Sequence, residues 1–160
     1  MTETEIKAKL REVLDLYGAA KIRRTQLERR LQRLRTEAED PVPALHFGKF
    51  RSGNKNAGSA PESLAVLIQE AEDEVGAQAV ETYRMMARVQ ALASLLPEGT
   101  MERAILEYKH IDGFTWREIC DAIPISRTPA TRHYKKALSL LARTEAALEI
   151  IRDAERKELI

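Results

Sequence analysis

The chain is poor in cysteine and in aromatic residues. Among its 160 residues there is one cysteine, Cys120, and aromatic side chains make up only 5%, whereas charged residues reach 32%. One cysteine excludes an internal disulfide and fits a reducing compartment, and we expect Cys120 to be a small buried side chain rather than a reactive thiol. Few aromatic and many charged residues argue against a β sandwich and are typical of long helices with seams of small side chains.

Long apolar runs and catalytic patterns are missing as well. No apolar stretch approaches membrane-spanning length, and the first ten residues lack the apolar core of a signal peptide, so we expect a cytoplasmic protein without a membrane partner. His46, His110 and His133 show no metal-ligand spacing, and Gly48 with Lys49 lacks the rest of a phosphate-binding loop. The acids of residues 70–74 would point in several directions from a helix, which favours an acidic surface. The sequence therefore predicts no enzyme, no cofactor and no metal site.

Charge is abundant but segregated. The formal net charge is only +1, yet residues 21–35 hold seven basic side chains against one Glu, and residues 62–81 hold six acidic side chains and no Lys or Arg. Both segments carry apolar residues at helical spacing, with Leu27, Leu31 and Leu34 in the first and Leu64 and Ile68 in the second. We expect two amphipathic helices that pair side by side, either within one chain or between two, because a thin apolar stripe needs a partner.

These patterns divide the chain into five segments. Residues 1–39 are expected to form a basic amphipathic helix, and residues 62–96 an acidic one that pairs with it as a hairpin or coiled coil and mediates dimerisation or higher oligomerisation. Residues 40–61 hold three Pro, three Gly and two Asn and are predicted to be a flexible linker, although a basic arm on DNA is an alternative. Residues 97–143 are predicted to be a helix-turn-helix DNA-binding domain. Residues 144–160 form a helical tail that extends the preceding helix or folds back.

The helix-turn-helix prediction rests on local signals. Thr115 and Glu118 match a capping box at a helix start, Pro124 interrupts that helix, and Ser126 can cap the next one. Pro129 falls in the first turn of the second helix, where its missing N–H costs little. The second helix has an apolar face, formed by Ala130, Tyr134, Ala137, Leu138 and Leu141. From residue 124 to residue 143 there are five Lys or Arg and no acid, which suits the major groove of DNA.

Nine residues are candidates for contact with DNA: Thr115, Arg117, Ser126, Arg127, Thr128, Thr131, Arg132, Lys135 and Lys136. We expect Thr128, Thr131 and Arg132 to read base edges, and Arg117, Lys135 and Lys136 to hold phosphates. A solvated helix face is the competing interpretation of the basic side chains. Arg127 could instead pair with Asp121 or Glu118 and brace the turn. Trp116 is expected to pack between helices.

Residues 101–141 (MERAILEYKHIDGFTWREICDAIPISRTPATRHYKKALSLL) resemble region 4 of sigma-70-type factors, and more closely the late-gene transcription activators of phages that infect Gram-positive bacteria. The resemblance implies an all-α fold with a helix-turn-helix, binding of double-stranded DNA, and promoter activation with host RNA polymerase as a further partner. Pro124 stands where a Gly usually makes the turn, and His133 replaces a usual apolar residue. Pro129 stands where sigma factors often carry a DNA-contacting Arg, so their promoter preference is not transferred.

The sequence thus predicts an all-α, phage- or prophage-type transcriptional regulator that binds double-stranded DNA sequence-specifically. The residues themselves do not distinguish activation from repression. Two alternatives stay open. A small terminase-like DNA-packaging subunit also joins a helix-turn-helix to an oligomerising helical part, and a sigma-like module could dock on RNA polymerase without binding DNA by itself.

Overall fold

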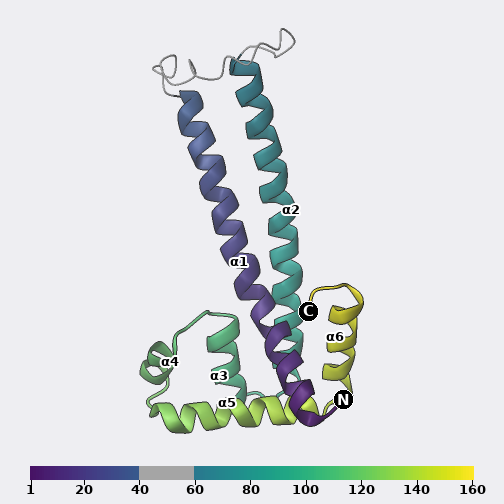
Figure 1. Ribbon diagram of the computed structural model, residues 1–160. Coiled ribbons are helices and arrows are strands. Elements are labelled where there is room, and N and C mark those ends of the chain that lie inside the picture. Colours follow the sequence, from purple (N-terminus) through teal and green to yellow (C-terminus); the bar gives the residue numbers. More distant parts are fainter. Residues whose placement is uncertain (40–59) are drawn as a thin grey trace. The chain divides into compact units, whose positions relative to one another are not determined.

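The structure is a computed structural model that describes residues 1–39 and 60–160, and these residues form α-helices without a β-strand (Figure 1). The expected all-α fold class is confirmed. The helices are α1 (Glu3–Glu39), α2 (Ala60–Ser94), α3 (Met101–His110), α4 (Trp116–Ala122), α5 (Arg127–Ala142) and α6 (Glu145–Arg156). The expected linker of residues 40–61, with its basic-arm alternative, lies outside the described residues except for its last two positions, which begin α2. In the described ranges no helix has the length and apolarity needed to cross a membrane.

The chain divides into two compact units. Residues 1–21 and 81–160 form the first, which we call the core unit, and residues 22–80 form the second, which we call the hairpin unit. The helices α1 and α2 each contribute to both units. All buried apolar residues of the main hydrophobic cluster belong to the core unit, where they come from all six helices.

Local chemistry sets several helix ends in the core unit. The helix α1 begins with a reciprocal capping box, in which the Thr2 N–H donates to Glu5 Oε2 at 2.6 Å and the Glu5 N–H donates to Thr2 Oγ1 at 3.3 Å. Thr100 caps α3 by accepting from the Arg103 N–H at 3.4 Å. After α3 the chain turns at Gly113, whose φ of +71° is a left-handed conformation that favours glycine.

The tail folds back rather than extending α5. Arg143 ends α5, and α6 starts after Thr144 and buries Ala147, Ile151 and Ala154 in the core unit. Ion pairs tie α6 to the other helices: Glu155 pairs with Lys9 of α1, and Asp153 pairs with Arg88 of α2 at 3.0 Å. The helix therefore closes one side of the core unit.

In the hairpin unit, residues 22–39 of α1 lie beside residues 60–80 of α2 (Figure 1). Leu27 and Leu31 are buried in the seam between them, at 5% and 7% exposure. Arg35 Nη2 pairs with Glu72 Oε1 across the seam at 2.9 Å. The basic and acidic segments therefore lie side by side within one chain.

Candidate nucleic-acid interface

The start of α4 is fixed by the capping box that the sequence predicts. The Thr115 N–H donates to Glu118 Oε2 at 2.7 Å, and the Glu118 N–H donates to Thr115 Oγ1 at 3.3 Å. Both side chains are exposed, and so is Arg117 in the first turn of α4. The hydroxyl of Thr115 is thus engaged in the cap, while the guanidinium of Arg117 extends into solvent with no ion pair to any described residue.

The connection from α4 to α5 spans four residues, Ile123 to Ser126. Ile123 has φ −112° and ψ 114°, the extended conformation that a following proline imposes, and in the described chain Glu158 alone among non-glycine residues has a positive φ. Pro124 therefore makes this turn without the left-handed residue that a glycine would supply. Ser126 stands at the N-cap position of α5 as expected, but its hydroxyl makes no cap hydrogen bond, so that part of the prediction is wrong.

The inner face of α5 packs as its periodicity predicts. Ala130, Ala137, Leu138 and Leu141 are fully buried and Tyr134 is 7% exposed. The helix contacts α3, α4 and α6. Trp116 meets the Tyr134 ring edge-on, with ring centroids 5.6 Å apart, and Lys109 Nζ lies 4.8 Å from the Trp116 ring centroid. Trp116 is thus a packing residue, and this packing fixes how α5 presents its other face.

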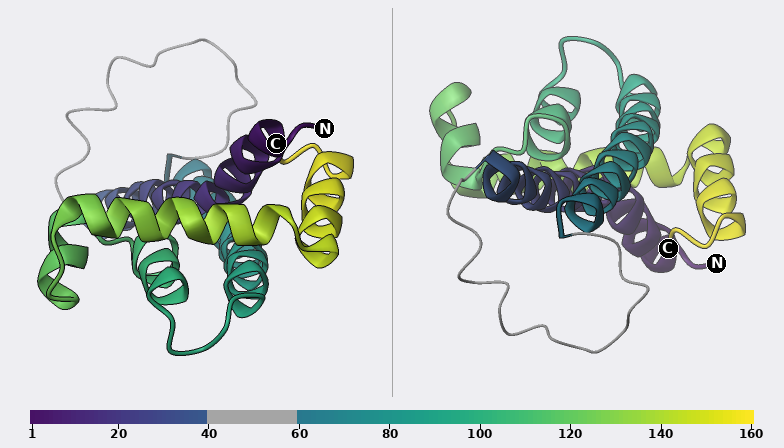
Figure 2. Two further views of the ribbon diagram at one scale, coloured as in Figure 1. Left: turned by 90° about the horizontal axis from the view of Figure 1, so that it is seen from below. Right: turned by 90° about the horizontal axis from the view of Figure 1, so that it is seen from above.

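The outer face of α5 carries a shallow depression lined by five of the nine candidates: Arg127, Thr128, Thr131, Arg132 and Lys135. No acidic side chain lines it, and its three cations form no ion pair with any described residue, so Arg127 does not brace the turn through Asp121 or Glu118. The Thr131 hydroxyl donates to the Arg127 carbonyl at 2.9 Å. Figure 2 (left) shows α5 in front, with no other helix of the core unit drawn across it. We call these five residues the α5 surface.

Lys136 stands apart from the α5 surface. Its Nζ donates to Glu102 Oε1 of α3 at 2.8 Å, and His133 Nδ1 lies 3.2 Å from the same oxygen. Glu102 is only 7% exposed, and its pKa falls from 4.5 to about 2 because Lys136, together with His133 and the backbone, hydrogen-bonds to the carboxylate. Lys136, expected to hold a phosphate, is therefore engaged in an ion pair that joins α5 to α3. His133 belongs to the same cluster.

A second polar cluster lies beneath the same helix. His110 of α3 is 6% exposed, with Nε2 at 3.0 Å from the Tyr134 hydroxyl of α5 and Nδ1 at 3.3 Å from Asp15 Oδ1 of α1. Burial, reinforced by Lys109, lowers the pKa of His110 to about 4, and burial raises the pKa of Tyr134 to about 12. A neutral imidazole that accepts from Tyr134 and donates to Asp15 satisfies this geometry. The cluster joins α1, α3 and α5.

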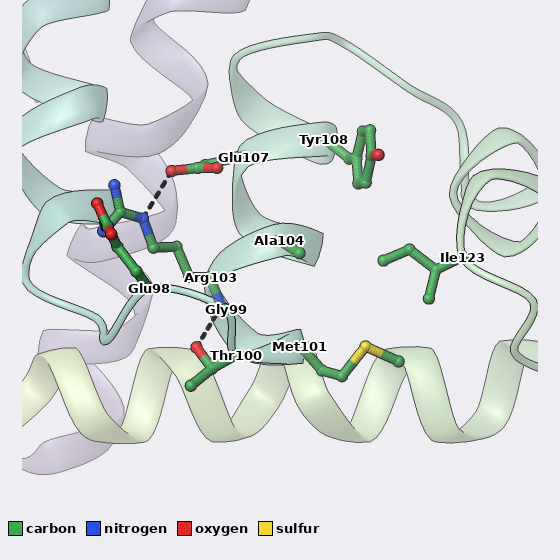
Figure 3. Close-up of a pocket in the computed structure, with 9 residues that line it drawn as sticks. All are labelled: Glu98, Gly99, Thr100, Met101, Arg103, Ala104, Glu107, Tyr108 and Ile123. Atoms are coloured by element: carbon green, nitrogen blue, oxygen red, sulfur yellow. Dashed lines mark hydrogen bonds and ion pairs between the residues drawn. The ribbon is translucent and has the colours of Figure 1, made fainter.

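Another depression lies between α3 and the end of α4 (Figure 3). Its charged groups already have partners, since Arg103 Nε donates to Glu107 Oε1 at 2.8 Å and Arg103 Nη1 donates to the Leu96 carbonyl at 3.3 Å. Glu98 lies 3.8 Å from the same guanidinium. This site offers no unpaired cation, which distinguishes it from the α5 surface.

The described residues hold no cluster of His, Cys, Asp and Glu that could bind a metal ion. Cys120 is half-buried on α4 against the hydrophobic cluster. No protein-family model, curated protein or solved structure matches the chain.

Proposed function

We propose that the chain is a sequence-specific regulator of transcription that binds double-stranded DNA, with α4 and α5 acting as a helix-turn-helix and α5 entering the major groove. The observation that carries this proposal is the α5 surface. Three cations and two threonines share one exposed side of a helix whose opposite side is locked into the core unit. Cations attract phosphates and guanine edges, and short side chains let a helix approach the groove closely.

We propose a division of roles between the residues of the α5 surface and Arg117 of α4. Thr128 and Arg132 lie one turn apart on α5 and are proposed to read base edges, together with Thr131. Lys135 and Arg117 are proposed to hold phosphates, because each is exposed and forms no ion pair with a described residue. Lys136 reaches a phosphate only if it leaves Glu102, so its contribution to affinity is expected to be smaller.

The resemblance to sigma-70 region 4 and to phage late-gene activators extends the proposal from binding to activation. In this extension the protein binds near a late promoter and contacts host RNA polymerase. The capping box at Thr115, the packing of Trp116 and the apolar face of α5 are compatible with such a module. The sign of regulation rests on the resemblance alone.

A selection from fragmented genomic DNA, repeated over a series of salt concentrations, tests the proposal. We expect the full-length protein to retain one recurring sequence, and Arg132→Ala to relax the preference at one position and to cost about 1–3 kcal/mol. Arg152 is an exposed arginine of α6, and Arg152→Ala serves as the matched control. It should change neither the sequence preference nor the affinity for DNA.

Two other results would redirect the assignment. Uniform retention of all fragments, falling steeply with salt, would indicate phosphate binding alone and would favour the DNA-packaging alternative. No retention at low salt, with binding to RNA polymerase intact, would favour the polymerase-docking alternative and refute the proposed interface.

A further inference from the structure

The hairpin unit leaves its own apolar seam incompletely covered. Leu27 and Leu31 of α1 are buried, but no residue of α2 between positions 62 and 80 is. The α2 side of the seam is only half-buried along its length, at Leu64, Ile68, Ala71, Val75 and Ala79. A two-stranded hairpin has no second layer to cover such a stripe, and two-helix seams of this kind are stabilised by further helices.

One flank of the seam is engaged and the other is not. Arg35 pairs with Glu72 across the hairpin at 2.9 Å. With about 3.6 residues per turn, Arg23 and Arg30 lie on the opposite flank of α1, and Glu70 and Glu74 lie on the opposite flank of α2. These four side chains are exposed and form no ion pair with a described residue. Leu67, 49% exposed, lies on the same flank of α2.

The two helical segments of the hairpin unit carry opposite net charge. Residues 22–39 hold six Arg against three Glu, and residues 60–80 hold five acidic side chains and no basic one. A nucleic acid does not suit this unit, because the acidic helix lies beside the basic one and the described acids outnumber the bases. A second copy of the chain does suit it, since a two-fold axis brings each basic flank against the acidic flank of the other copy.

We propose that the hairpin unit binds a second copy of this chain, so that each α1 lies between its own α2 and the α2 of the partner subunit. In this four-helix arrangement both half-buried seams face a common core, and Arg30 faces Glu74 of the partner subunit, because the pairs Arg35–Glu72 and Ala20–Thr82 put these positions of α1 and α2 at one level. Arg23 and Glu70 add to the basic and the acidic flank on either side of this contact. The proposal does not depend on the proposed DNA binding, since it uses none of the residues of the α5 surface.

Charge reversal tests the pairing directly. Sedimentation velocity of the full-length protein should show a dimer at tens of micromolar, with self-association that weakens as salt rises. Arg23→Glu/Arg30→Glu and Glu70→Arg/Glu74→Arg should each weaken self-association by at least about tenfold, because every change counts twice at a two-fold interface. Mixing the two variants restores opposite charges at every contact and should restore a dimer.

Adjacent residues supply the matched control. Leu67→Gln should weaken the dimer, whereas Val66→Gln should leave it unchanged, because Val66 is exposed to a similar extent, 56% against 49%, but lies away from the seam. Circular dichroism of each variant shows whether the helices persist. A monomeric wild-type protein at low salt, an unaffected Arg23→Glu/Arg30→Glu dimer, or a mixture that does not associate would each overturn the proposal. DNA selection with the same variants distinguishes dimerisation through the hairpin unit from DNA binding through the α5 surface. A variant that loses the dimer and still binds DNA would support the first proposal and leave the second intact.

Discussion

The adjacent lysines Lys135 and Lys136 are expected to act on different properties of the protein. Lys135 is exposed and has no acidic partner among the described residues, whereas Lys136 Nζ lies 2.8 Å from Glu102 Oε1. We compare Lys135→Met with Lys136→Met, since methionine keeps most of the aliphatic side chain and removes the charge. The Lys135 variant should weaken DNA binding, and the Lys136 variant should chiefly lower the free energy of unfolding.

The size of the expected loss in stability of Lys136→Met follows from the pKa of Glu102. Its pKa falls from 4.5 to about 2, and each tenfold change in proton affinity is worth about 1.4 kcal/mol, so all its interactions together contribute at most about 3 kcal/mol. His133 and the backbone N–H remain in the variant, and Lys136 itself is largely exposed, so solvent screens the pair. We expect Lys136→Met to lower the free energy of unfolding by about 1–2 kcal/mol at neutral pH.

The sign of the pH dependence is also fixed. A carboxylate whose pKa is lowered on folding stabilises the fold above pH 4.5, and this contribution is lost as the pH falls toward about 2. In Lys136→Met the pKa of Glu102 rises toward its ordinary value, so less stability remains to be lost over this range. The difference between variant and wild type should therefore shrink in acid.

Urea denaturation at neutral and acid pH measures the loss of stability in Lys136→Met. DNA affinity over a series of salt concentrations measures the loss of binding in Lys135→Met. Lys135→Met should unfold within about 0.5 kcal/mol of the wild type and should reduce the slope of log affinity against log salt by about 1. If Lys136→Met matches the stability of the wild type and loses the same salt slope as Lys135→Met, the ion pair with Glu102 does not hold the ammonium, and our reasoning is wrong.

Three further predictions concern stability. Burial lowers the pKa of His110 on folding from 6.5 to about 4, so the free energy of unfolding should decrease by up to about 3 kcal/mol as the pH falls through this range. In His110→Gln the free energy of unfolding should depend less on pH over the same range. A dependence as steep as that of the wild type would contradict this prediction. Gly113→Ala should cost about 1 kcal/mol because φ is +71°. Gly18→Ala lies inside α1, where the added methyl meets nothing within 4 Å beyond its chain neighbours and the backbone of its own helix, and it should stabilise by up to about 1 kcal/mol. Urea denaturation should therefore give opposite signs for the two variants. Pro124→Gly should destabilise by about 0.5–1 kcal/mol through the freedom it gives the unfolded chain, and a rise in thermal stability would instead mean that the proline strains the turn.

Features encoded by neighbouring residues were predictable from the sequence. The capping box at Thr115 and Glu118 needs only a spacing of three, and the buried face of α5 needs only helical periodicity. The position of Ser126 was predictable for the same reason. Its cap hydrogen bond was not, because the residue type marks where a helix starts while the side-chain rotamer is chosen by its surroundings.

Pairs formed between distant segments were not predictable. Glu102 and Lys136 come from different helices, and Asp15 lies far along the chain from His110. No local pattern links such residues, so the sequence indicates neither the partners of His110 nor the partner of Lys136. The pairing of the basic and acidic helices was the exception, because net charges of opposite sign extend over whole segments and carry the signal that single residues lack.

The ion pairs and hydrogen bonds between helices reduce the number of basic side chains on α5 that are available to bind DNA. A basic helix face by itself is equally compatible with a solvated surface. On α5, however, Tyr134 is engaged by His110, while His133 and Lys136 are engaged by Glu102. Paired polar side chains have a structural reason to be there, whereas Arg127, Arg132 and Lys135 form no ion pair with a described residue. These three cations line one depression within residues 127–135 of α5, toward the end of the helix that a recognition helix presents to base edges. The proposed interface is therefore smaller than the basic face that the sequence suggests and is shifted toward the start of α5.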